Sequence, residues 1–209
     1  KRFQFDEAIG YYEQAAGLTH QQYLSWAGAQ YRELGAYWTR SNLQLMWDLV
    51  EPEVGQGYDW FNQMGTEECF GAAASAGVHY LALFHEGGIL DGRLRNPLER
   101  AGDYQRFVGD VVERYDGDGQ GDAPGGIRIT HWQVGNETPR IAALPDAAEV
   151  YADWFELTAG AVRRADPAAK VVLVGSTDSS IVDGLHRQVM PLLAERGVRF
   201  DAVDIHHWG

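Results

Sequence analysis

The segment HWQVGNE, residues 131–137, ends an apolar run with an amide and a carboxylate, Asn136 and Glu137. Neither side chain favours an apolar core, but together they combine hydrogen-bonding groups with a group that gives or takes a proton. Successive strand residues point to opposite faces, so the two share one cavity only where twist or a bulge re-aims one of them. The competing interpretation is a polar loop in which Glu137 is a solvated charge ahead of a turn at Pro139.

Five short apolar runs rich in β-branched or aromatic residues predict strands that would position such groups. A weaker sixth run lies near residues 5–11. The five clear runs are Ala36–Ser41, Val78–Phe84, Ile129–Gly135, Lys170–Gly175 and Phe200–His206.

Amphipathic stretches between these runs predict helices, several of them followed by glycine, which relieves a left-handed helix end. The expected helices are Gln21–Leu34, Trp60–Ala76, Asn96–Tyr115, Asp146–Ala165 and Ile181–Arg196. Strand and helix therefore alternate, which is typical of an α/β protein with a parallel sheet. The glycine-rich phosphate motif of doubly wound sheets is absent, so we predict a (β/α)8 TIM barrel, and we expect no cofactor.

A barrel of this kind holds its catalytic groups at the carboxyl ends of its strands. Polar or aromatic residues follow nearly every predicted strand of this chain. Those that bear on chemistry are Arg40, His85, Glu86, Asn136, Glu137, His206, His207 and Trp208.

The composition narrows the classes of partner. The chain has 209 residues, 45% of them hydrophobic, and a net charge of -13, so its surface repels nucleic acid and anionic membranes. A carbohydrate substrate is compatible with this charge. One cysteine, Cys69, forms no internal disulfide and leaves the compartment open, with export slightly favoured over the cytoplasm. We find no linker or repeat and expect one domain over residues 1–209.

The pattern W-x-x-x-N-E, from Trp132 to Glu137, resembles the fourth-strand motif of the clan-A glycoside hydrolases, which are retaining enzymes on a (β/α)8 barrel. The run RYDGDGQGDAPGGIRIT before it is similar to a subgroup of bacterial members. LGAYWTRSN and WDLVEPEVGQGYDW resemble the family's second strand and the stretch that leads into its second helix. FDAVDIHHWG resembles the sixth strand. The family motif often continues with proline, whereas Thr138 intervenes here before Pro139.

The resemblance implies a role for each matched residue. Glu137 would be the general acid/base, Asn136 would bind the sugar 2-hydroxyl, and Arg40 would hold the nucleophile. His85 would bind the innermost sugar. One strand-six histidine would face the pocket, and we choose His206 because Val203 and Ile205 then face the helices. We also assign Trp208 to substrate binding, and we expect Trp47 and Trp132 in the core rather than as sugar platforms.

A retaining glycosidase needs a second carboxylate roughly 5 to 5.5 Å from the acid, which the family carries on strand seven. The chain given ends at Gly209, just after the predicted strand six. We therefore expect the barrel to be incomplete here, with strands seven and eight and the nucleophile glutamate beyond residue 209.

Two other functions stay open. A metal-dependent hydrolase or isomerase would use His85, Glu137, His206 and His207 as ligands, and a non-catalytic carbohydrate-binding barrel would keep Glu137 without a nucleophile. The acidic loop Asp116–Asp122 resembles a calcium loop but lacks its distal glutamate. We predict no metal in the site.

Overall fold

The computed structural model describes residues 17–40, 44–62, 65–89, 92–176 and 180–206. Its strands are β1 (Trp38–Thr39), β2 (Gln44–Leu45), β3 (His79–Phe84), β4 (His131–Val134), β5 (Lys170–Ser176) and β6 (Ala202–Ile205). Its helices are α2 (His20–Glu33), α3 (Trp47–Val50), α4 (Thr66–Ala76), α5 (Ala101–Tyr115), α6 (Pro139–Ala142), α7 (Ala147–Ala165) and α8 (Ser180–Glu195), with a short 3-10 turn, η1 (Gly87–Ile89).

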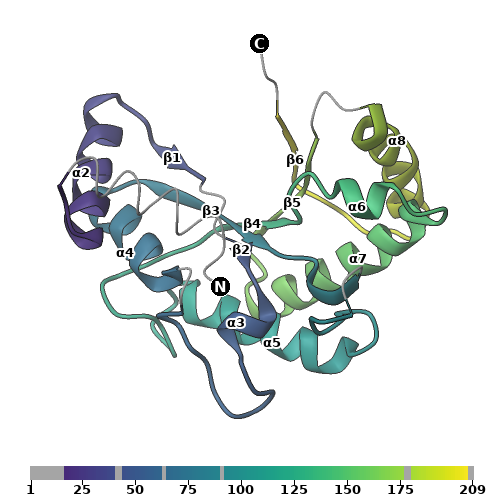
Figure 1. Cartoon of the computed structure of the whole chain (residues 1–209), viewed down its shortest axis with the longest axis horizontal. Helices are drawn as coiled ribbons and strands as arrows, with labels where there is room; N and C mark the ends of the chain where they lie inside the picture. Colours follow the sequence, from purple (N-terminus) through teal and green to yellow (C-terminus); the bar gives the residue numbers. More distant parts are fainter. Residues whose placement is uncertain (1–16, 41–43, 63–64, 90–91, 177–179, 207–209) are drawn as a thin grey trace.

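The strands form one parallel sheet in the order β1, β3, β4, β5, β6, and β2 also pairs with β3. Figure 1 shows this sheet curling, with α4, α5 and α7 along one of its faces. A curved parallel sheet with helices between its strands is typical of a (β/α) barrel. The described strands form about half of such a barrel. The predicted α/β barrel class is confirmed for this part.

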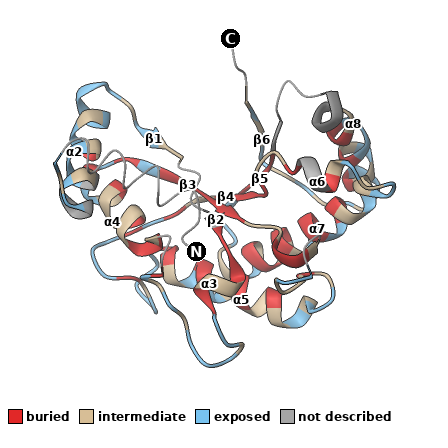
Figure 2. Ribbon diagram, in the orientation of Figure 1, coloured by how far each residue is buried: buried red, intermediate tan, exposed pale blue. Residues whose placement is uncertain are grey.

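The core lies between the sheet and the helices that follow β3 and β4. Phe84 on β3 stacks on Trp132 of β4 and meets Phe107 of α5 edge to face. Buried residues therefore concentrate on the strands and on the helix faces turned toward them (Figure 2). Trp47 and Trp132 are both buried, as expected of core residues.

The alternation of strand and helix agrees closely with the sequence prediction, with two exceptions at helix starts. The helix predicted from Trp60 begins only at Thr66, because Trp60 instead lies under the Arg114 guanidinium and against Tyr115. The helix predicted from Asn96 begins at Ala101, because the Asn96 side chain accepts from the Leu98 N–H and forms a turn. The weak strand at residues 5–11 lies outside the described residues.

The first strand is also broken rather than continuous. Thr39 pairs with Tyr80 and Gln44 with Leu83, so this strand advances five residues while β3 advances three. The extra length lies between Thr39 and Gln44. Arg40 directly follows β1 and so lies at the carboxyl end of that strand, where it was expected. None of the described helices has the length and apolarity needed to cross a membrane.

Candidate active site

The end of β4 has an unusual backbone that sets the direction of Glu137. Gly135 has φ +82, and a Cβ there would lie 2.7 Å from Thr138 and 3.1 Å from Trp154. Glu137 and Thr138 have positive φ values of 58 and 22, which side-chain-bearing residues rarely adopt. The backbone therefore departs from strand geometry at this position, as expected if Asn136 and Glu137 share one cavity.

Tyr151 of α7 fixes the point from which this turn departs. Its hydroxyl donates to the carbonyl of Val134 at 2.8 Å and accepts from the N–H of Val174 at 3.0 Å. The β4–β5 register has ended before Val134, so the hydroxyl bridges the two strands where they separate. Burial raises the pKa of Tyr151 well above its ordinary value, which keeps the hydroxyl protonated as a donor.

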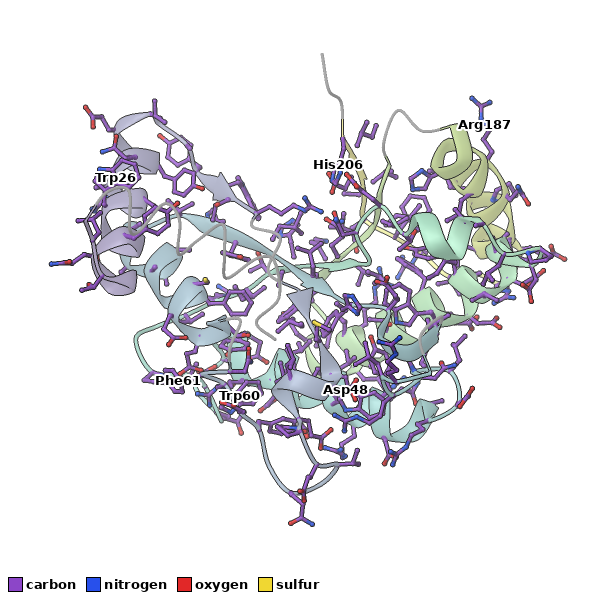
Figure 3. All side chains as sticks on the ribbon, viewed as in Figure 1. Trp26, Asp48, Trp60, Phe61, Arg187 and His206 are labelled. Carbon is purple, nitrogen blue, oxygen red and sulfur yellow. The ribbon has the colours of Figure 1, made fainter. Side chains whose placement is uncertain are left out.

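Glu137 contacts the end of β6. Its Oε1 lies 2.6 Å from Nδ1 of His206, and Nε2 of the same ring lies 2.8 Å from Oδ2 of Asp204. His206 lies at the open side of the sheet, near the carboxyl ends of the strands (Figure 3). The side chain of Glu137 is 33% exposed and that of His206 is 12% exposed, so the pair is covered but still reachable.

Arg40 connects the two strand ends. Its Nη2 donates to Oδ1 of Asn136, and its Nε lies 3.6 Å from Oδ2 of Asp204. This Nε is buried and has no hydrogen-bond partner among the described residues. The charge of the nearby Asp204 carboxylate therefore offsets part of the cost of burying it. Arg40, Asn136, Glu137, Asp204 and His206 thus form one connected group, which we call the strand-end cluster.

The sequence prediction missed Asp204. It appeared as one of two acids in FDAVDIHH, although the spacing Asp-x-His places both side chains on one face of a strand. That same alternation correctly turned His206 inward. Val203 packs against the core as expected, but the prediction for Ile205 was wrong: it is 73% exposed because no helix among the described residues covers it.

The other predicted site residues divide as follows. His85 follows β3, where its Nδ1 accepts from the N–H of Gly87 at 2.9 Å and its Nε2 lies 3.8 Å from Glu86 Oε2. The neutral ring therefore carries its proton on Nε2. Among the described residues, no hydrogen bond or ion pair joins His85 to the strand-end cluster. Trp208 and His207 lie outside the described residues.

Of the residues considered as metal ligands, the structure describes His85, Glu137 and His206. Among the described residues, the only group close enough to share an ion is Asp116, Asp118 and Asp122, in the loop after α5. Their oxygens accept backbone N–H groups of the same loop, including Gly117, Gly119 and Gln120. His85, Glu137 and His206 do not form such a group. The strand-end cluster is thus equipped for proton transfer and hydrogen bonding by side chains.

No protein-family model matches this chain, and no curated protein matches it in sequence. Solved structures do match in fold. A monomeric β-xylosidase from Caulobacter crescentus is 17% identical with a TM-score of 0.60, over 89% of this chain and 38% of its own. A β-galactosidase from the psychrophilic Marinomonas ef1 is 12% identical with a TM-score of 0.58, over 88% and 38%.

A variant of the intracellular xylanase of Thermoanaerobacterium saccharolyticum, solved with xylotriose, is 11% identical with a TM-score of 0.58, over 81% of this chain and 55% of its own. This chain therefore spans about two fifths to just over half the length of the structures it matches. At these identities the likeness shows a shared fold. This chain therefore shares the (β/α) barrel fold of these structures, over the part that they have in common.

Proposed function

We propose that this chain carries the acid/base residue of a retaining O-glycosidase acting on β-linked glycosides. The observation that carries the proposal is Glu137: a partly exposed carboxyl group just beyond β4, on a left-handed backbone, hydrogen-bonded to a histidine at the end of β6. The glycosidase fold of the matching structures supports the same reading, and one of them binds xylotriose and another xylotetraose. We take residues 1–209 as one barrel domain.

In this proposal Glu137 protonates the glycosidic oxygen as the bond to the anomeric carbon breaks, and later accepts a proton from the attacking water. Because Arg40 only donates, it must face the oxygen of the Asn136 amide. The Nδ2 donors of Asn136 are then available for a sugar hydroxyl. A contact to the 2-hydroxyl would strengthen as the oxocarbenium-like transition state forms.

The retaining mechanism also requires a nucleophile. Asp204 is the other carboxylate of the strand-end cluster, but the His206 ring lies between it and Glu137. It is therefore not placed to attack a sugar held against Glu137. We expect the nucleophile to be a glutamate at the end of a seventh strand beyond residue 209, within hydrogen-bonding reach of Arg40 or His206. His85 and Trp208 would complete the sugar subsite.

The acid role is tested by varying the leaving group. Glu137→Gln should nearly abolish hydrolysis of unactivated β-glycosides and spare much of the activity on nitrophenyl glycosides, whose leaving group hardly needs a proton. For Glu137→Ala, added azide should restore turnover and give the β-configured glycosyl azide, because azide attacks the glycosyl-enzyme without a base. Equal loss on both substrate types would contradict the assignment. Glu53→Gln, the same change at an exposed glutamate, is the matched control.

A non-catalytic carbohydrate-binding barrel would give a different result. Xylo-oligosaccharides would bind and protect the wild-type protein, yet no glycoside would be hydrolysed. A stoichiometric transition metal whose removal abolishes activity would instead favour the metal-dependent enzyme.

A further inference from the structure

Asp204 has two contacts that converge on one oxygen. Its Oδ2 lies 2.8 Å from Nε2 of His206 and 3.6 Å from Nε of Arg40. The Asp204 side chain is 19% exposed and that of Arg40 22% exposed, so water competes only partly for these contacts. Asp204 therefore links the arginine that holds Asn136 to the histidine that holds Glu137.

Hydrogen-bond roles within this group follow from what each side chain is able to donate. Arginine has donors only, so the Asp204 oxygen that faces Arg40 has to act as an acceptor. The same oxygen then accepts from His206, which places a proton on Nε2. Nδ1 of the neutral ring is left as an acceptor, directed at Oε1 of Glu137 2.6 Å away. In this tautomer a protonated Glu137 donates its O–H to His206.

We infer that Asp204 is a positioning residue for the acid: it fixes the tautomer and orientation of His206 so that Nδ1 accepts a hydrogen bond from protonated Glu137 before reaction, and this proton passes to the glycosidic oxygen as the glycosidic bond breaks. The inference rests on the proposed function, in which Glu137 enters the reaction protonated. Asp204 acts through His206 and touches no reacting atom.

The tautomer is measured without any substrate. Long-range proton–nitrogen NMR spectra of the full chain report which imidazole nitrogen of His206 is protonated, and the signal is identified by its loss in His206→Gln. In the wild-type protein we expect the proton on Nε2. Asp204→Ala should distribute it over both nitrogens, whereas Asp204→Asn should keep the proton on Nε2, because an amide oxygen in the place of Oδ2 still accepts from that nitrogen. An unprotonated Nε2 in the wild type, or no change in Asp204→Ala, would overturn the inference.

Kinetic measurements then test whether the tautomer of His206 affects proton donation by Glu137. Asp204→Ala should lower kcat on unactivated β-glycosides roughly tenfold or more, which is part of the 10²–10⁴-fold rate increase that general acid catalysis supplies. It should lower kcat on nitrophenyl glycosides much less. Asp201→Ala is the matched control, since it removes a β6-side carboxylate that pairs with Arg163. It should alter neither the ratio between the two substrates nor the tautomer.

The two proposals fail separately. If the wild-type protein hydrolyses no glycoside, the proposed function fails, while the NMR result still decides whether Asp204 fixes the tautomer of His206. If the protein is a glycosidase and Asp204→Ala lowers both substrates equally, Asp204 is structural and the acid assignment of Glu137 stands.

Discussion

Two glutamates of this chain, Glu51 and Glu137, both engage nitrogen-bearing side chains, yet their surroundings differ. The carboxylate of Glu51 is fully buried and accepts from Trp47 Nε1, the Gly55 N–H and Arg106 Nη2. Glu137 is one-third exposed and, within the part of the chain that the structure describes, has one side-chain partner, His206. A carboxylate saturated by fixed donors is suited to hold structure, whereas one with unused capacity at a strand end is suited to exchange a proton.

The same substitution at both positions would test this difference. Glu137→Gln should reduce kcat on unactivated glycosides by about 10²–10⁴-fold, because the amide has no acidic proton to give. Its free energy of unfolding should change by less than about 1 kcal/mol, since the side chain is partly exposed. Steady-state kinetics and urea denaturation give the two numbers. A large loss of stability with intact turnover would reverse the roles of the two glutamates.

Glu51→Gln should show the opposite pattern. One face of the amide would present N–H groups to donors of Trp47 or Arg106, leaving buried donors without an acceptor. We expect a loss of about 2–4 kcal/mol in the free energy of unfolding. For folded protein at low temperature, kcat should be nearly that of the wild type. Glu53→Gln again serves as control, and a stability equal to wild type would show that the Glu51 contacts are replaceable.

Removing the hydroxyl group of Tyr151 tests whether core packing at the end of β4 affects activity at the strand-end cluster. Tyr151→Phe leaves the Val134 carbonyl and the Val174 N–H unpaired in the core, which should cost about 1–3 kcal/mol. Tyr151 bridges β4 and β5 at the point from which the turn carrying Glu137 departs. Its loss should therefore displace the acid, so that kcat should fall more than KM rises. Tyr104→Phe, which removes another fully buried hydroxyl from the core, is the comparison variant. Equal effects of both variants on kcat would show that Tyr151 only stabilises the fold.

The smallest expected effect is on the pH dependence of stability. It concerns His131 at the start of β4, whereas Glu137 lies beyond the other end of this strand. Burial lowers the pKa of His131, at the start of β4, below its ordinary value near 6.5. The unfolded chain therefore binds more protons than the folded one just below pH 6.5, and stability falls as the pH drops through that value toward the folded pKa. His131→Gln should flatten this part of the stability curve measured by urea denaturation. The pH profile of activity should stay unchanged, because Glu137 lies at the other end of the strand.

Local sequence patterns were sufficient to predict much of the fold. Apolar runs identified β3 to β6, and the glycines after α2, α4 and α8 identified where those helices end. The start of α4 was not predictable in this way, because it depends on Trp60 packing against Tyr115, a contact between segments far apart in sequence. The break between β1 and β2 likewise depends on register with β3.

The site was predictable to a similar degree. Motif and alternation together predicted Asn136, Glu137 and His206 as site residues, and the structure brings them together with Arg40. Asp204 was not found, since its importance comes from Arg40, more than 160 residues earlier, approaching the same oxygen that faces His206. Spacing within one strand does not reveal which partner a distant strand supplies.

The left-handed backbone at Glu137 has a consequence for protein engineering. A residue with a Cβ costs roughly 1–2 kcal/mol in this conformation, whereas glycine adopts it freely and asparagine more readily than glutamate. A library selected for thermal stability alone should therefore enrich Gly or Asn at position 137. Variants selected for turnover should keep the glutamate, so the two selections pull this position in opposite directions.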